Sequence, residues 1–160
     1  DYMNKKNILF LKVSLILIAV ATLLLCIFWL PRLAERTAIA NPEYVYLRYP
    51  ILIMIYITAI PFYIAFYRAY GILNNIKRGE VFTHKPLGSL KIIRNCAISE
   101  LAIYIILSLF LFSQDALHPG IAIAFAIIQF TALIIAVFAG VLIELLNKAI
   151  ELKDDNDLTI

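Results

Sequence analysis

Residues 121–146 read IAIAFAIIQFTALIIAVFAGVLIELL, an apolar run in which Glu144 is the one charged side chain. A helix needs about 20 mostly apolar residues to cross the hydrocarbon core of a bilayer. Many of these residues are β-branched, which would favour strands in water. The run is far too long for a strand, however, and in lipid a helix satisfies its own backbone hydrogen bonds. The run therefore predicts a transmembrane helix.

Three further runs have the same character, at residues 8–30, 51–73 and 92–113. The composition agrees, since 63% of the 160 residues are hydrophobic and only 16% are charged. Soluble domains are about half apolar and a quarter charged. No Gly-rich or Ser-rich linker divides the chain. We predict an all-α fold, in which residues 1–160 form a single domain built as a bundle of four transmembrane helices.

The first run follows Lys5 and Lys6 and precedes Ala38-Ile39-Ala40, so it resembles a secretory signal peptide. Its apolar stretch is longer than a signal h-region, and the small residues lie well beyond its end. We therefore expect a retained membrane anchor, with cleavage as the alternative.

The orientation follows from the distribution of Lys and Arg, which are enriched in cytoplasmic loops. Two sides of the predicted bundle differ strongly in these residues. One side carries Lys5, Lys6, Lys12, Lys77, Arg78, Lys85, Lys91, Arg94, Lys148 and Lys153, and the other carries Arg32, Arg36 and Arg48. We predict a multi-pass protein of the bacterial cytoplasmic membrane with both termini inside.

The segment 74–91, named the docking loop below, joins the second and third spans. Gly79 can supply the positive φ that ends a helix, and Thr83 suits the N-cap of the next one. The simplest interpretation is a topogenic loop that contacts lipid headgroups. The alternative is a surface for a cytoplasmic protein partner, with these candidate residues: Lys77, Arg78, Gly79, Phe82, Thr83, Lys85 and Lys91.

The same segment carries a motif, Ile76-x-x-Gly79-x-Val81-Phe82-Thr83, followed by Leu90-Lys91-x-Ile93. This pattern resembles that of the YoaS-like family, small uncharacterised bacterial membrane proteins with four spans. The family pattern tends to have an Asn before the helix, where this chain has Lys85-Pro86. The resemblance implies the span layout and proximity to helix-turn-helix regulators in the genome, but no activity.

Ionisable side chains inside a membrane are costly and indicate a functional or structural site. Arg68 and Glu100 lie at similar depth in adjacent spans, so we expect them to be within reach of each other. Glu100 belongs to a polar stripe with Cys96, Tyr104 and Ser108, and we expect tyrosines of the second span to face it. The candidate intramembrane polar site comprises Arg68, Glu100, Tyr104 and Tyr67, with Tyr56, Tyr63 and Tyr70 on the same face as Tyr67.

This site has two interpretations. The structural one is an interhelical ion pair with tyrosine support. The functional one is a proton or cation site around Glu100. On the fourth span, Ala132, Ala136 and Gly140 recur every four residues, which favours close packing inside the bundle, with a homodimer face as the alternative.

No catalytic, cofactor-binding or metal-binding motif is found in the sequence. Cys26 and Cys96 lie at different predicted depths, so we expect free thiols. Nucleic acid is not an expected partner, because the basic residues lie at the membrane interface. The expected partners are the lipid bilayer and either a protein or further copies of the chain.

Three functions fit these features. The first is a non-enzymatic accessory or regulatory membrane protein that acts through partner binding. The second is a small oligomeric transporter or ion pathway that uses the Glu100 and Arg68 site, since four helices alone enclose little space. The third is an immunity or resistance protein against a membrane-active peptide.

Overall fold

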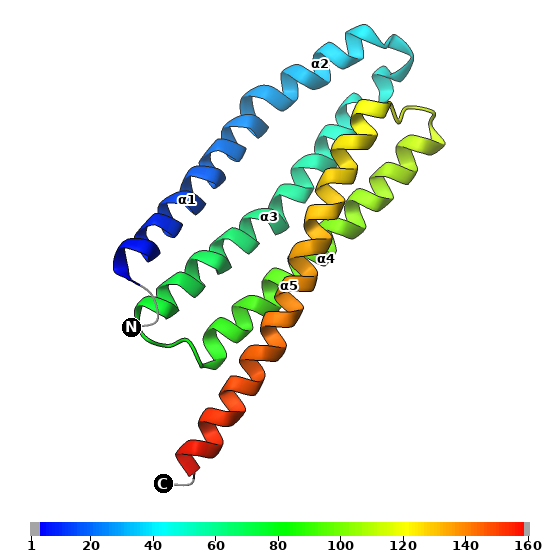
Figure 1. The fold of residues 1–160 in the computed structure, drawn as a ribbon. Coiled ribbons are helices and arrows are strands. Elements are labelled where there is room, and N and C mark those ends of the chain that lie inside the picture. Colours follow the sequence, from blue (N-terminus) through cyan, green and yellow to red (C-terminus); the bar gives the residue numbers. More distant parts are fainter. Residues whose placement is uncertain (1–3, 159–160) are drawn as a thin grey trace.

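The computed structural model describes residues 4–158, which are almost entirely helical (Figure 1). The first three and last two residues of the predicted domain lie outside this description. The elements are α1 (Lys5–Leu24), the π-helix η1 (Leu25–Trp29), α2 (Leu30–Ala40), the 3-10 helix η2 (Pro42–Leu47), α3 (Arg48–Lys77), α4 (His84–Ser113) and α5 (Pro119–Leu158). Across residues 4–158 there is no strand, which confirms the all-α class.

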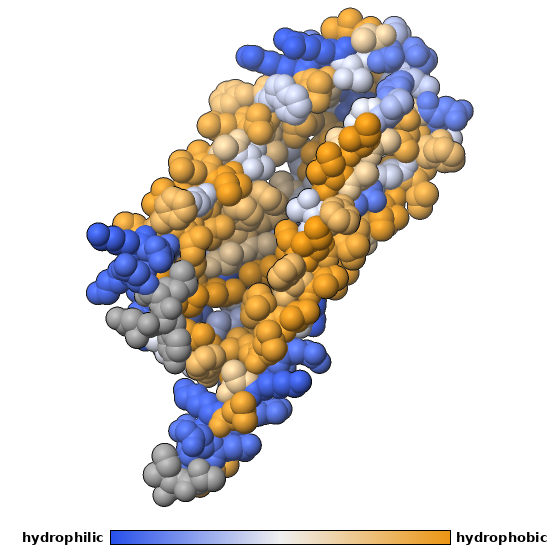
Figure 2. All heavy atoms as spheres, in the orientation of Figure 1, coloured by the Kyte–Doolittle hydropathy of each residue, from blue (hydrophilic) through white to orange (hydrophobic). Residues whose placement is uncertain are grey.

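Four stretches are long and apolar enough to cross a membrane, and each contains one predicted span: Lys5–Ala40, Pro42–Lys77, His84–Ser113 and Pro119–Leu158. Figure 2 shows a broad hydrophobic band between two hydrophilic ends. The start of α1, the turn between α3 and α4, and the end of α5 lie at the end that we name the basic end (Figure 1). The four spans of the prediction are confirmed.

The helices are longer than the apolar runs that predicted them. Hydropathy placed residues 31–50 in a loop, but most of them are helical, in α2 and η2. In the same way, α5 continues from Leu146 to Leu158, about three further turns. Hydropathy detects only the lipid-embedded part of a helix, whereas backbone hydrogen bonding continues through charged residues in water.

Helix α4 is the centre of the bundle, because it packs extensively on both α3 and α5. Two apolar clusters hold these three helices together. The first lies toward the end opposite the basic end and contains Leu47, Tyr104, Leu107, Leu111, Ala116 and Phe125. The second lies at the basic end and contains Leu87, Ile143 and Ile150.

The small residues of α5 face this interior. Ala132, Ala139 and Ile143 are buried, while Ala136 and Gly140 are half-buried. Ala132 therefore packs inside the bundle, as predicted for the small-residue stripe. The predicted close approach is wrong at Gly140, because a Cβ added there would meet no neighbouring atom within 4 Å.

The segment before α3 closes the end opposite the basic end. The Tyr44 hydroxyl donates to the backbone carbonyl of Asp115 at 2.6 Å, and the Tyr46 hydroxyl donates to Oε1 of Gln114 at 2.8 Å. The Tyr44 ring also meets the ring of His118 edge-on, with centroids 5.9 Å apart. These contacts join η2 to the turn between α4 and α5.

Helix α1 is attached differently, through polar contacts with α3 at regular intervals. The Tyr63 hydroxyl donates to the carbonyl of Ala19 at 2.8 Å, and the Tyr56 hydroxyl donates to the carbonyl of Cys26, in the π-helix, at 2.7 Å. Nearer the basic end, the Lys12 ammonium donates to Oδ1 of Asn74 and lies 5.0 Å from the centroid of the Tyr70 ring. The contacted residues of α1 and η1, namely Lys12, Ala19 and Cys26, are seven positions apart along the chain. The contacts therefore form one line along the helix, which we name the tyrosine seam.

The expectation that these tyrosines face the polar stripe of the third span is wrong for Tyr56 and Tyr63. Thr58, which contacts α4, is two positions after Tyr56 and therefore about 200° around α3 from it. Tyr63 is seven positions after Tyr56 and lies on nearly the same face as it. The tyrosine face and the α4-contacting face are thus opposite sides of one helix.

Removing one hydroxyl of the tyrosine seam should loosen α1. We predict that Tyr63→Phe lowers the free energy of unfolding in detergent micelles by about 0.6 to 1.7 kcal/mol, the range for interhelical hydrogen bonds in membranes. Denaturant titration followed by circular dichroism measures this. Tyr67→Phe is the matched control, because Tyr67 is 75% exposed and its hydroxyl has no partner within residues 4–158. An equal loss in both variants would contradict the seam.

Candidate functional site

The turn between α3 and α4 is built by backbone geometry around Gly79. Its φ is +76°, the left-handed conformation predicted for it. The Gly79 amide donates to the carbonyl of Ile76 at 3.1 Å, and the Glu80 amide donates to the carbonyl of Asn75 at 2.8 Å. This pair of bonds is a Schellman motif, which satisfies the last carbonyls of α3. Any side chain at position 79 would strain the turn.

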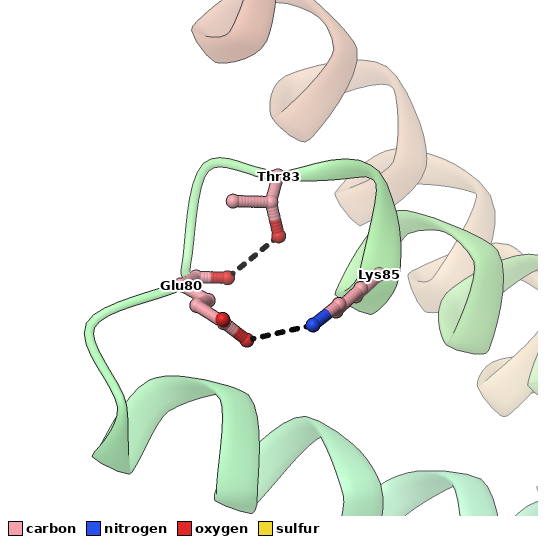
Figure 3. Close-up of polar contacts among 3 residues, drawn as sticks. All are labelled: Glu80, Thr83 and Lys85. Carbon is pink, nitrogen blue, oxygen red and sulfur yellow. Dashed lines mark hydrogen bonds and ion pairs between the residues drawn. The ribbon is translucent and has the colours of Figure 1, made fainter.

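Glu80 organises the rest of the turn (Figure 3). Its carboxylate pairs with the Lys85 ammonium at 3.6 Å, and its carbonyl accepts a hydrogen bond from the Thr83 hydroxyl at 2.9 Å. Thr83 does occupy the N-cap position of α4, as predicted, with an extended backbone. The prediction that its side chain caps the helix is wrong, because the hydroxyl is already committed to the Glu80 carbonyl.

The residues predicted as the docking loop divide into two groups. Phe82 packs against the cluster of Leu87, Ile143 and Ile150, so it fixes the loop to α5. The others surround the turn, with Gly79 in its backbone and Thr83 bonded to Glu80. The side chains exposed at the basic end are Lys77, Arg78, Lys85 and Lys91.

The end of α5 projects beyond the other helices at the basic end (Figure 1). Its last buried residue is Ile150, 6% exposed, which belongs to the same cluster that Phe82 contacts. Beyond it, Leu152 is 70% exposed and Leu158 is 84% exposed. Around these leucines the projecting helix carries Glu151, Lys153, Asp154, Asp155 and Asp157.

Within the membrane, Tyr104 is the meeting point of three helices. Its hydroxyl is 3.1 Å from the hydroxyl of Thr58 on α3, and its ring meets Phe125 of α5 edge-on at 5.3 Å. Gln129 of α5 donates to the Ser108 hydroxyl at 2.9 Å and to the Tyr104 carbonyl at 3.3 Å. Thr58, only 3% exposed, belongs to this junction of three helices, although it was not predicted from the sequence. Its one signal was a hydroxyl in the middle of an apolar span.

Within residues 4–158, the other candidates for the intramembrane polar site make no hydrogen bond with Tyr104. In the described part of the chain, Arg68 and Glu100 form no ion pair, so the interpretation of this site as an interhelical ion pair is wrong, whereas their lying within reach of each other stays a prediction. Oε1 of Glu100 is buried without a hydrogen-bond partner. Tyr67 is mostly exposed. Arg68 is about 100° around α3 from Tyr67 and lies between the face toward α1 and the face toward α4.

Two cavities adjoin Arg68. One is an apolar groove of about 760 Å³ between α1 and α3, lined mainly by Leu23, Ala59, Ile60, Tyr63 and Ile64. The other, the basic pocket, has a volume of about 420 Å³ and is lined by Tyr67, Arg68, Tyr70, Gly71, Asn74, Asn75, Arg78, Lys85 and Ser89. Tyr67 and Arg68 line both cavities.

The two cysteines are free thiols, as expected, with Cys96 buried in α4 and Cys26 half-buried in η1. Across the described part of the chain, no three His, Cys, Asp or Glu side chains are grouped so that they could hold a metal ion.

Comparisons with known proteins agree with the motif in the docking loop. The model of a family described as a protein of unknown function, DUF2975, matches residues 32–160. The chain is also similar to the uncharacterized membrane protein YoaS of Bacillus subtilis (strain 168), with 38% identity over 160 residues. That match covers 99% of this chain and 100% of the relative. The resemblance inferred from the motif is confirmed. No solved structure matches the chain.

A double-mutant cycle tests the separation of Arg68 from Glu100. We predict that the losses of unfolding free energy in Arg68→Ala and Glu100→Ala add within about 0.5 kcal/mol in the double variant, as for residues without direct contact. Thr58→Ala with Tyr104→Phe is the positive control, because these hydroxyls touch and should couple by about 0.6 kcal/mol. A coupling above about 1 kcal/mol for Arg68 and Glu100 would show that they meet.

Proposed function

The chain belongs to DUF2975, a family of unknown function, and from this premise we propose that it is a non-enzymatic accessory protein that acts by binding a protein partner. Its setting in this proposal is the bacterial cytoplasmic membrane, with the basic end in the cytoplasm. A bacterial relative that is itself a membrane protein supports the setting. The distribution of Lys and Arg supports the orientation.

The observation that carries the proposal is the projecting end of α5. Leu152 and Leu158 stand on a helix that has left the bundle, so they cannot be covered by the other helices. Burying a leucine side chain against a partner releases about 1.5 to 3 kcal/mol relative to leaving it in water.

The projecting helix is also held in a defined position, which favours recognition. Ile150 packs with Leu87 of α4, and Phe82 of the docking loop packs on both. The acidic tip of α5 and the basic side chains of the loop lie at the same end of the molecule, so both signs of charge are presented there. Such a surface favours a partner whose own face combines an apolar centre with both signs of charge.

The proposed orientation predicts the outcome of reporter fusions. A reporter that is active only in the cytoplasm should be active when fused after the C-terminus and inactive when inserted at Asn41, between α2 and η2. Enzyme activity in intact cells measures this, with a reporter active only outside as the reciprocal control. The reverse pattern would place the basic end outside.

Partner binding predicts an effect of one exposed leucine. We expect that affinity purification of tagged protein in mild detergent returns a stoichiometric protein partner, and that Leu152→Ser lowers its recovery at least about fivefold, the effect of losing roughly 1 kcal/mol of apolar burial. Ile39→Ser is the matched control, because Ile39 is 72% exposed at the opposite end. The absence of a stoichiometric partner, or equal losses in both variants, would refute the proposal.

A further inference from the structure

The basic pocket has the composition of an anion-binding site. Among residues 4–158, its lining comprises the cations Arg68, Arg78 and Lys85 and no carboxylate. The nearest acidic group in the turn is Glu80, which is paired with Lys85. The remaining lining residues include Asn74, Asn75, Ser89 and two tyrosines, all of which can donate hydrogen bonds.

The two guanidinium groups are uncommitted. Within residues 4–158, neither the Arg68 nor the Arg78 side chain makes a hydrogen bond or an ion pair. Arg68 is half-buried near the edge of the apolar region, where an unpartnered cation is costly. A guanidinium offers several donors in a planar fork that matches a phosphate group, so a phosphate would satisfy both side chains.

The apolar groove extends from this pocket along α1 and α3. Its walls are the aliphatic side chains of Leu23, Ala59, Ile60 and Ile64, together with the ring of Tyr63. The Tyr63 hydroxyl is occupied by the Ala19 carbonyl, so the ring presents an apolar surface to the groove. The groove is open on one side, toward the place where a bilayer would supply acyl chains.

Tyr67 and Arg68 line both cavities, so the groove and the basic pocket lie side by side at these two residues. An apolar groove beside a cationic pocket at the membrane surface matches a lipid with an anionic headgroup. We propose that this chain binds an anionic phospholipid of the leaflet at the basic end, with an acyl chain in the apolar groove and the phosphate between Arg68 and Arg78. This inference is independent of the proposed protein partner.

The site differs from the general lipid contact of any transmembrane surface. An annular lipid covers an exposed apolar face without regard to its headgroup. Here the headgroup position is defined by Arg68 of α3, Arg78 at the end of α3 and Lys85 of α4, and the chain position by a groove between α1 and α3. The Lys12 contact with Asn74 and Tyr70 holds α1 beside the pocket. The bound lipid would therefore also link α1 to the rest of the bundle.

Native mass spectrometry of the purified full chain, titrated with dioleoyl phosphatidylglycerol or dioleoyl phosphatidylcholine, tests the proposal. We expect one phosphatidylglycerol to be retained at least about tenfold more tightly than phosphatidylcholine. Arg68→Gln and Arg78→Gln should each weaken phosphatidylglycerol binding by about tenfold, the effect of losing one hydrogen bond to a charged group. Lys77→Gln and Arg94→Gln, which remove nearby cations outside the pocket, should leave it unchanged.

Two further arms separate a lipid from a soluble phosphate. Glycerol 3-phosphate should neither bind detectably nor raise the melting temperature, and Ala59→Phe, which fills the groove, should weaken phosphatidylglycerol binding. Binding of glycerol 3-phosphate as tight as that of the lipid would overturn the lipid assignment. Equal binding of the two lipids, or no effect of the arginine variants, would reduce the site to annular contact. Arg78 is exposed, so Arg78→Gln keeps the test valid if Arg68→Gln fails to fold.

Discussion

Tyr104 lies where α3, α4 and α5 meet, and the arrangement of these helices depends on how the hydroxyl and the backbone carbonyl of Tyr104 are satisfied. In hydrocarbon, water cannot compensate an unpaired donor or acceptor, so each must find a partner on a neighbouring helix. The Thr58 hydroxyl of α3 bonds the Tyr104 hydroxyl, and the Gln129 amide of α5 donates to the Tyr104 carbonyl. Because both partners contact one residue of α4, they fix the depth and the rotation of three helices together. Apolar packing alone specifies these less well, since lipid chains are as apolar as the side chains.

Helix α1 lies outside this junction and is held by a different principle. Most of its side chains are exposed, where lipid would surround the helix, and its polar contacts with α3 are two tyrosine hydroxyls and one lysine spaced at seven-residue intervals. Hydrogen bonds at three points bring two helices together without interlocking their side chains along the whole length. A groove therefore remains between them, and it opens at the basic end beside Arg68. The attachment of α1 and the proposed lipid site thus have the same structural origin.

The basic end combines rigidity with exposure. The Schellman turn at Gly79 and the Glu80 contacts with Thr83 and Lys85 define the path of the docking loop. Phe82 and Ile150 then join that loop to α5. As a result, charged side chains on two separate segments are held in fixed relation, although each segment by itself would be a solvated surface. Both the proposed partner surface and the proposed lipid site depend on this rigidity.

The sequence by itself determined the four spans, the turn at Gly79 and the family, because apolar length, a glycine with positive φ and a short motif are local properties. It also determined that Ala132 and its neighbours face a helix, since small residues recur on one side of α5. Only the tertiary structure decided which neighbour each polar face meets. Tyr56 and Thr58 are two residues apart, yet they face α1 and α4 respectively, and no local pattern says on which side of α3 those helices lie. For the same reason Arg68 and Glu100, which share a predicted depth, form no ion pair within residues 4–158: depth follows from counting along each helix, whereas contact depends on the rotation that the whole bundle imposes.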